Sequence, residues 1–352
     1  MGSTLAYFKE MPKIELHVHV EGATTAEVYY KLAQKNQVSL PADTLTDWQR
    51  YFEFTDFNHF ISVYVSAVKV LKDASDYAYI IEEFYKYQSQ QNILYTEAYL
   101  SASFLVERFE DDEILDAIEE GIKKGQSKYK VVVRFIPDIA RHITATKDDV
   151  LRLVIKGHQR GLFIGLGLGG IELGFPPELF EETYKKAQAA GLKLVAHAGE
   201  VDGASSIWQA ISQLNAARIG HGIRCLDDAE LVAYLVEKQI PIEVSPTSNY
   251  CTKVIESNSH HPIKQMMEEG INCNLNSDDP AMFSTSLAGE YLLLYQQGFS
   301  LEQLWQLNFN ALEAAFLSEQ EKNDYKKIFH DYLDNTPFVS GGLDKKNNQQ
   351  IL

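Results

Sequence analysis

Two histidines one residue apart, His17 and His19, lie at the end of a short apolar run that covers residues 14–20. In a β-strand, side chains alternate between the two faces, so these two imidazoles point the same way. They would converge beyond the carboxyl end of the strand and supply two of the ligands that a divalent transition metal needs. A His-x-His pair alone is weak evidence, because paired surface histidines are common.

Three further polar groups follow apolar runs elsewhere in the chain. They are His197 in Val195-Ala-His-Ala-Gly-Glu200, His221 in Arg218-Ile-Gly-His-Gly222, and the carboxylate pair in Asn276-Ser-Asp-Asp-Pro280. Each group closes a short apolar segment and precedes a turn. Because all of them occupy the same kind of position, at the end of an expected strand, the pattern favours one shared site.

The elements that would position these groups alternate along the chain. Short apolar, β-branched runs predict strands, and the segments between them have helical periodicity. The expected strands cover residues 14–20, 94–100, 131–137, 163–168, 192–197, 218–220, 240–244 and 271–275, and helical segments cover 177–190, 205–214, 227–238 and 262–268. Eight such units in 352 residues favour an α/β fold, an eight-stranded parallel β/α barrel of the TIM type.

A doubly wound open sheet is the main alternative fold. Dinucleotide-binding sheets of that kind carry Gly-x-Gly-x-x-Gly at the start of their first helix, and no such motif follows the first expected strand. The glycine-rich run Gly165-Leu-Gly-Leu-Gly-Gly170 comes too late and precedes no clear helix start. We interpret this run as a tight turn.

Extra helices are expected in two places. The segment between the first two strands is too long for one helix and is rich in aromatic residues: Trp48, Tyr51, Phe52, Phe54, Phe57, Phe60 and Tyr64. We expect most of them to pack on the flank of the barrel, while part of the insertion could instead cap the site and stack on an aromatic ligand. Further helices are expected over residues 286–297, 301–317 and 320–333.

The chain shows no linker, repeat or low-complexity tract, so we expect a single domain over residues 1–352. Its core should cover residues 11–335, with a disordered polar tail over 340–352. The sequence is compatible with a homo-oligomer but does not specify one.

Composition narrows the functional class. A net charge of −17 argues against a nucleic-acid partner, because such binding relies on cationic surface. The cysteines (Cys225, Cys251, Cys273) are odd in number and far apart, which indicates a reducing compartment without disulfides. No secretory signal is visible, and no apolar run approaches the roughly 20 residues that span a bilayer. We expect a cytoplasmic protein that acts on a small molecule and not at a membrane.

In a β/α barrel, the carboxyl ends of the strands converge on one mouth. His17, His19, His197 and Asp278 are therefore the predicted metal ligands. Three neutral imidazoles and one carboxylate suit zinc, with iron or another divalent ion as the alternative. The remaining coordination position would hold a water molecule whose pKa the metal lowers, giving hydroxide near neutral pH.

Three acid–base groups remain. Glu200, three residues beyond a ligand, could transfer a proton to or from the substrate, and His221 and Asp279 could take a proton from the water and orient it. Each has a simpler interpretation: Asp278-Asp279 as an exposed turn and His221 as a structural histidine. The remaining histidines have no partner motif and receive no role: His59, His142, His158, His260, His261 and His330.

Taken together, these segments resemble the adenosine deaminase family over about residues 11–335. The resemblance rests on Met11-Pro-Lys-Ile-Glu-Leu-His-Val-His-Val-Glu-Gly22, His197-Ala-Gly-Glu200, Arg218-Ile-Gly-His-Gly222, Ser245-Pro-Thr-Ser-Asn249 and Asn276-Ser-Asp-Asp-Pro280, which occur in the family's order. It implies a hydrolytic deaminase with one zinc ion per chain, acting at C6 of a 6-aminopurine and releasing ammonia.

The resemblance also implies roles for single residues. His17, His19, His197 and Asp278 match the zinc ligands. Glu200 matches the proton donor to purine N1, and His221 and Asp279 match the pair that handles the attacking water. The substrate contacts it implies come from His19, Glu21, Gly170 and Asp279.

The identity of the substrate is less sharply defined. Glu21 stands where adenosine deaminases typically carry Asp, and Glu is shared there with adenine deaminases and aminodeoxyfutalosine deaminases. Gly220 stands where adenine deaminases usually carry Asp. The stretch 167–172 is similar to the aminodeoxyfutalosine subgroup, although Ile171 replaces an acidic residue. We expect a purine nucleoside, adenosine or a 5′-modified relative, ahead of free adenine.

Other classes fit less well. Amidohydrolases and phosphotriesterases share His-x-His but commonly use a bridging lysine, and none stands out here. The His-x-Glu and Pro-Cys-x-x-Cys signature of nucleic-acid deaminases is missing. A non-catalytic binding protein on the same scaffold would require a broken motif, and all seven metal and catalytic positions are intact.

Overall fold

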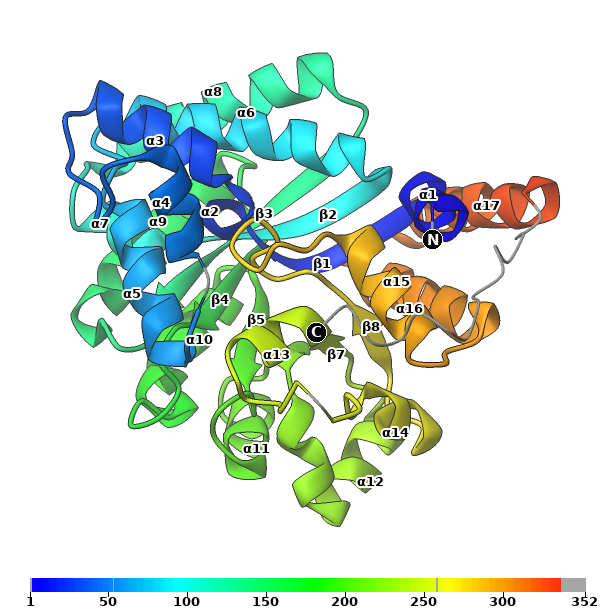
Figure 1. The fold of residues 1–352 in the computed structure, drawn as a ribbon. Helices are drawn as coiled ribbons and strands as arrows, with labels where there is room; N and C mark the ends of the chain where they lie inside the picture. The colour runs from blue at the N-terminus through cyan, green and yellow to red at the C-terminus, as the bar shows by residue number, and fades with distance from the viewer. Residues whose placement is uncertain (1, 53, 258, 337–352) are drawn as a thin grey trace.

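The computed structural model describes residues 2–52, 54–257 and 259–336, and within them eight parallel strands follow one another around a barrel, with helices outside (Figure 1). The strands are β1 (Lys13–His19), β2 (Ile93–Leu100), β3 (Val132–Ala140), β4 (Gly165–Gly169), β5 (Lys193–Ala198), β6 (Arg218–His221), β7 (Ile242–Val244) and β8 (Cys273–Leu275). The predicted fold class is confirmed, and each expected strand overlaps an observed one.

Helices surround the sheet and also fill the two expected extensions. They are α1 (Gly2–Glu10), α2 (Val20–Ala23), α3 (Ala26–Lys35), α4 (Leu45–Tyr51), α5 (Phe57–Val68), α6 (Ala74–Gln90), α7 (Ala102–Val106), α8 (Asp111–Lys128), α9 (Lys147–Gln159), α10 (Glu181–Ala189), α11 (Ala204–Ser212), α12 (Ala229–Lys238), α13 (Pro246–Cys251), α14 (Ile263–Glu268), α15 (Leu287–Gln296), α16 (Leu301–Ala314) and α17 (Glu319–Asn335). Short 3₁₀ turns cover Thr144–Thr146, Pro177–Phe180 and Ile223–Asp227.

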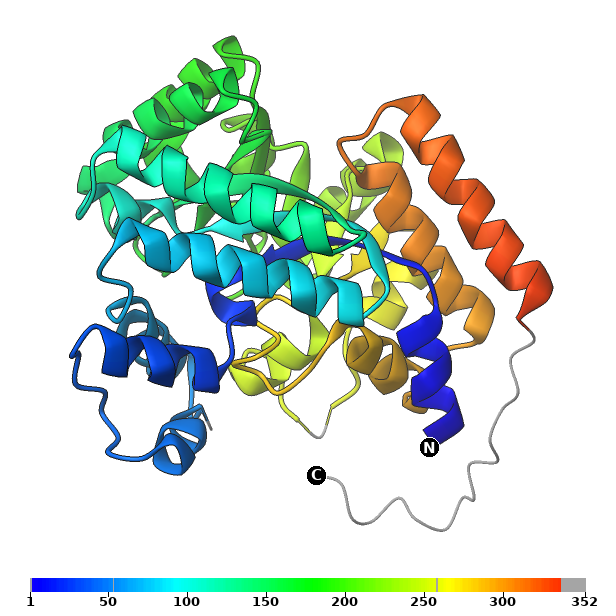
Figure 2. The same ribbon diagram turned by 90° about the horizontal axis from the view of Figure 1, so that it is seen from above.

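The two extensions lie on different sides of the barrel. Helices α3 to α5 gather on one side, and α1 lies beside α15, α16 and α17 on the other (Figure 2). The sequence analysis did not predict α1. The expected tail, residues 340–352, lies outside the described residues. None of the described helices has the length and apolar character needed to cross a membrane.

Strand β1 is buried on both faces, but the two faces differ in chemistry. Ile14, Leu16 and Val18 belong to the hydrophobic core. The alternate positions, Glu15, His17 and His19, are polar and at most 8% exposed. Because side chains alternate along a strand, this polar series faces the interior of the barrel while the aliphatic series packs beneath the helices.

The barrel closes between its last and first strands at the site residues themselves. The N–H of Asp278 donates to the carbonyl of His17 at 3.1 Å, and the N–H of His19 donates to the carbonyl of Asp278 at 2.8 Å. Just before this bridge, Oδ1 of Asn276 accepts hydrogen bonds from the N–H groups of Leu16 at 2.9 Å and His17 at 3.0 Å. The Asn276 side chain thus continues the hydrogen bonding between the last and first strands beyond Leu275, where β8 ends.

Replacing Asn276 with alanine should therefore destabilise the barrel. The substitution leaves two buried N–H groups without an acceptor, and we expect it to lower the free energy of unfolding by about 3 kcal/mol. Urea unfolding followed by circular dichroism measures the change. Asn58→Ala, at an exposed position of α5, is the control and should leave the midpoint unchanged. Equal midpoints for both variants would contradict the role of Asn276.

Candidate metal and catalytic centre

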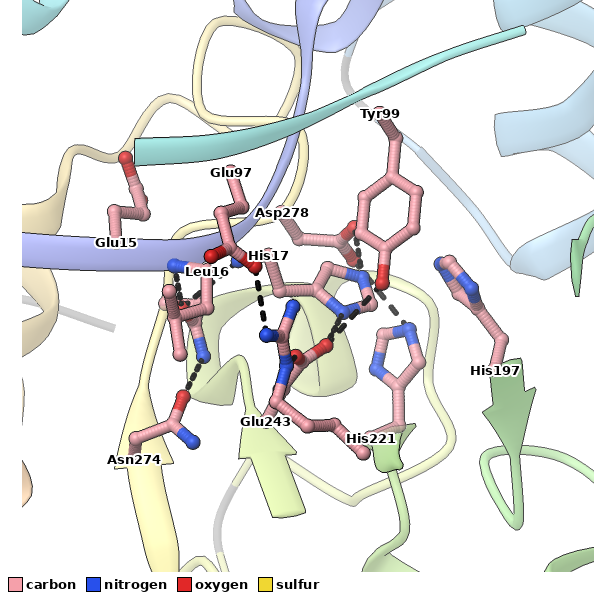
Figure 3. Close-up of polar contacts among 12 residues, drawn as sticks. Glu15, Leu16, His17, Glu97, Tyr99, His197, His221, Glu243, Asn274 and Asp278 are labelled. Atoms are coloured by element: carbon pink, nitrogen blue, oxygen red, sulfur yellow. Dashed lines mark hydrogen bonds and ion pairs between the residues drawn. The ribbon is translucent and has the colours of Figure 1, made fainter. Parts of the chain in front are cut away.

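The four predicted metal ligands come together at the carboxyl ends of β1, β5 and β8. Nε2 of His19 lies 3.2 Å from Nε2 of His197. Oδ1 of Asp278 lies 3.3 Å from Nε2 of His17 and 3.4 Å from Nε2 of His19. In Figure 3, His17, His197, His221 and Asp278 surround one region inside the barrel.

These separations fit the coordination of a single ion. Two donors bound at 2.0–2.1 Å in a tetrahedral arrangement lie about 3.3 Å apart. Nε2 of His17 is buried and has no hydrogen-bond partner, which leaves its lone pair available to an ion. His221 also lies close to this centre. Together with His17, His197 and Asp278 it forms a group whose candidate donor atoms are all within 4.8 Å of one another. The residues present fit a divalent metal.

Hydrogen bonds on the far side of two imidazoles orient them toward this centre. Nδ1 of His17 lies 3.0 Å from Oε2 of Glu243. Nδ1 of His197 lies 2.8 Å from the carbonyl of Leu168. Both partners are acceptors, so each Nδ1 carries the proton and each Nε2 presents its lone pair, the tautomer that a metal ligand requires.

A buried charge network supports Glu243. Arg218, which is 1% exposed, contacts Oε2 of Glu97 at 2.6 Å and Oε1 of Glu243 at 2.5 Å. Its guanidinium also lies 4.0 Å from the ring centre of Phe316. Burial alone would raise the pKa of Glu243, but Arg218 and His17 hold it below its ordinary value. The sequence analysis quoted Arg218 within a motif but assigned it no role, and it missed Glu97 and Glu243.

The predicted acid–base groups line the same cavity. Nε2 of His221 lies 3.7 Å from Oε2 of Glu200 and 3.8 Å from Oδ2 of Asp278. On the other side of the ring, the amide of Asn249 lies 3.4 Å from Nδ1 of His221, and its oxygen lies 3.0 Å from Nε2 of His261. His261, which received no role from the sequence, therefore positions His221 through Asn249.

Two of the site residues have unusual backbone conformations. His221 has a φ of 64° and Asp278 a φ of 61°, in the left-handed region that side chains other than glycine seldom adopt. Such strain persists only where surrounding contacts impose it, and it often accompanies functional sites. For Asp278, the backbone bonds that close the barrel impose it.

The carboxyl groups of the site divide into two electrostatic classes. Burial alone would raise the pKa of Asp278, but its close contacts with His17 and His19 hold it well below its ordinary value. Burial and the nearby charge of Asp278 raise the pKa of Glu200 and that of Asp279 well above the ordinary value. One carboxylate thus stays ionised, as a ligand must, while its neighbours favour the protonated form.

Glu172 fixes the backbone that carries Glu200. Its Oε1 accepts from the N–H of Gly199 at 2.6 Å, and its Oε2 accepts from the N–H of Glu200 at 3.1 Å and from the next two N–H groups at 2.8 and 2.9 Å. Burial alone would raise the pKa of Glu172, but Arg141 and these bonds hold it below its ordinary value. The sequence offered no signal for this role, because these contacts join residues that are far apart in the chain.

The cavity contains about 670 Å³ of space, including its open mouth. Its walls are apolar on one side and polar on the other. It is lined by His19, Phe57, Phe60, Ile61, Tyr64, Val65, Ser101, Phe104, Asp138, Ala140, His142, Gly170, His197, Glu200, His221, Ser248, Thr252, Asp278 and Asp279. The sequence analysis missed Asp138 and His142.

The aromatic insertion contributes to both the core and the cavity. Phe57, Phe60 and Tyr64 of α5 line the cavity, whereas Trp48 is fully buried and stacks on Tyr51 with ring centres 5.8 Å apart. Both interpretations of this segment therefore apply, each to a different part of it.

Two predicted substrate contacts, Gly170 and Glu21, differ in their position relative to the cavity. Gly170 lines the cavity at a φ of 85°, where an added Cβ would lie 2.7 Å from Nδ1 of His142. Glu21 is fully buried and is not among the residues that line the cavity. Its Oε1 accepts from the N–H of Ser101 at 3.0 Å, its Oε2 has no partner, and burial raises its pKa to about 7.

The barrel and the cluster at its mouth define a metal-dependent hydrolase of the β/α-barrel type. Residues 12–331 match the model of the family described as adenosine deaminase. An adenine deaminase of Wolinella succinogenes is 34% identical over 321 residues, covering 90% of this chain and 96% of that protein. An aminodeoxyfutalosine deaminase of Streptomyces avermitilis is 35% identical over 326 residues, covering 90% of each.

The crystal structure of an adenine deaminase from Arthrobacter aurescens has a TM-score of 0.87 and 28% identity, covering 92% of this chain and 99% of that one. The chain belongs to the adenosine deaminase family. It is a hydrolase that acts on C–N bonds of cyclic amidines.

Gly220 in β6 offers a test of the ligand geometry. A Cβ at this position would lie 2.6 Å from Cε1 and 2.9 Å from Nδ1 of His17. Gly220→Ala should therefore displace the imidazole and weaken metal binding about 10- to 100-fold, measured by competition with a chromophoric chelator. The control is Gly203→Ala, where a Cβ meets nothing within 4 Å. Unchanged affinity in Gly220→Ala would show that His17 is not a ligand.

Proposed function

We propose that the protein deaminates a 6-aminopurine nucleoside by zinc-dependent hydrolysis, with His17, His19, His197 and Asp278 as the ligands. The substrate would be adenosine or a 5′-modified relative such as aminodeoxyfutalosine, and the products the 6-oxopurine and ammonia. The observation that carries this proposal is the convergence of these four side chains at one point, with Glu200, His221 and Asp279 lining the same cavity.

The chain's own residues divide the chemistry between them. When bound, the ion would supply Lewis acidity that makes water nucleophilic near neutral pH. His221 and Asp279 would orient that water, and His221, whose pKa burial lowers, would accept its proton and return it to the C6 amino group as the C6–N bond breaks and ammonia leaves. Glu200 donates a proton to N1 of the purine, so that the electrons displaced by attack at C6 rest on a neutral nitrogen. Glu172 holds Glu200 in position through the backbone.

Binding would come from the walls of the cavity. Phe57, Phe60 and Tyr64 present apolar surface suited to a purine or to an apolar 5′ substituent. Gly170 lets the substrate approach the backbone because it has no side chain, and His19 and Asp279 lie beside the reacting end of the purine. A purine is then enclosed between aromatic faces and the polar floor of the barrel.

Free adenine is the second candidate substrate. The similarity to the adenine deaminase of Wolinella succinogenes, at 34% identity, favours it. One observation counts against it. Adenine deaminases usually carry aspartate where this chain has Gly220, and a Cβ at this position would lie only 2.6 Å from Cε1 of His17. We therefore retain the nucleoside as the first choice.

The direct test is turnover on a panel of adenosine, aminodeoxyfutalosine and adenine, followed by release of ammonia. We expect the highest kcat/KM on a nucleoside, one zinc per chain by elemental analysis, loss of activity on chelation and its return when zinc is added. The proposal fails if the zinc-loaded protein releases ammonia from none of the three.

Glu200→Gln separates proton donation from metal binding. The amide keeps the shape of the side chain but cannot donate a proton to N1, so kcat should fall about 10²- to 10⁴-fold while zinc content stays unchanged. In the unsubstituted protein, kcat/KM should be constant at lower pH and decline as alkaline pH removes the Glu200 proton. The exposed Glu178→Gln is the control. A fully active Glu200→Gln enzyme would remove Glu200 from the mechanism.

A further inference from the structure

Asp138, near the end of β3, is a buried acid with no assigned task. It is 5% exposed and lines the cavity. Among the described residues no other group donates a hydrogen bond to its carboxylate, which receives one from its own backbone N–H and interacts electrostatically with His19 and His17. A buried carboxylate without partners is costly, so an acid retained in this state is usually completed by a ligand.

Other buried acids of the barrel differ in this respect. Glu243 has Arg218 and His17, and Glu172 has a series of backbone N–H groups. Glu15 accepts from Ser277 and Gln88. Glu21 and Asp279 are closer to Asp138 in this respect, because each also has a carboxylate oxygen without a hydrogen-bond partner.

The glycine-rich strand β4 is shaped around Asp138. Asp138 pairs with Gly167 and Ala140 with Gly169 in the β3–β4 register. A Cβ at Gly169 would lie 2.7 Å from Oδ2 of Asp138, and a Cβ at Gly167 would lie 3.0 Å from its Cβ. Side chains on β4 would displace the carboxylate. The run that the sequence analysis interpreted as a tight turn is therefore a strand whose missing side chains make room for this group.

The ionisable side chains that line the cavity are, apart from Tyr64, acids and histidines. Asp138, Glu200, Asp278 and Asp279 all line it, and none of the described lining residues is a lysine or an arginine. Recognition of a phosphate depends on charge-assisted hydrogen bonds, above all from arginine or lysine. The phosphate of a purine nucleotide would therefore lose part of its hydration in this cavity without gaining such a partner from the described lining side chains.

We propose that Asp138 is a specificity-determining residue that accepts a hydrogen bond from a neutral hydroxyl or N–H of the substrate and, in a cavity whose described lining lacks lysine and arginine, disfavours purine nucleotides. The ligand class is thus the uncharged nucleoside or base. The inference rests on the proposed function only in taking the ligand to be a purine.

Binding of the reaction products tests the inference without relying on turnover. Inosine, hypoxanthine and inosine 5′-monophosphate would be titrated into the zinc-loaded full-length protein by calorimetry. We expect the tighter of the two neutral ligands to bind at least about 100-fold more strongly than the monophosphate, because no lysine or arginine among the described lining residues can donate hydrogen bonds to the phosphate. Equal affinity for inosine and its monophosphate would overturn the exclusion of nucleotides.

Asp138→Asn tests the residue itself. The amide keeps the shape of the side chain but loses the charge, so affinity for the neutral ligand should fall about 10- to 100-fold. The ratio of the affinities for the neutral ligand and for the monophosphate should therefore decrease. Zinc content and thermal midpoint should be unchanged. The control is Asp148→Asn, the same substitution at an exposed position. Affinities unchanged in Asp138→Asn would overturn the role of Asp138, whereas absence of ammonia release from every substrate would overturn only the proposed function.

Discussion

The backbone pairing between Asp278 and the end of β1 is the constraint on which the rest of the structure depends. The hydrogen bonds that close the barrel belong to His17, His19 and Asp278, whose side chains also form the proposed metal site. An ion bound there would cross-link the first and last strands where the ladder is thinnest. Folding and assembly of the site are therefore one event, and the left-handed conformation of Asp278 is the local cost of that arrangement.

An acidic interior is workable because each carboxyl group meets a different electrostatic environment. Arg218 neutralises Glu97 and Glu243, which keeps Glu243 available to orient His17. Glu200 has no such cation, so burial and neighbouring charge favour its protonated form. An ionised carboxylate that orients His17 and a carboxyl group that favours its protonated form can therefore lie inside one barrel, because their neighbours differ.

The sequence predicted the strands and the meeting of seven polar residues at one mouth because both depend on local pattern; the metal and catalytic roles of these residues stay predictions. Apolar runs define the strands, and polar residues at their carboxyl ends must meet at one mouth. Glu172, Glu243 and Asp138 could not be found in this way, because each acts through a residue distant in the chain. Their roles depend on strand register and on space left by glycine, as at Gly169 beside Asp138. These properties appear only when the chain is folded.

The aromatic insertion shows how one segment can serve two purposes. Trp48 and Phe52 bury their rings in the core, which anchors the segment, while Phe60 of the next helix faces the cavity and contacts Phe283 beyond β8, with ring centres 5.0 Å apart. The wall is therefore tied both to the insertion and to the loop that follows Asp279. Excluding water with rigid rings lowers the local dielectric, which strengthens the charge effects on Glu200 and Asp279. The aromatic wall thus supports the proposed chemistry indirectly, because it strengthens the electrostatic effects on the pKa values of Glu200 and Asp279.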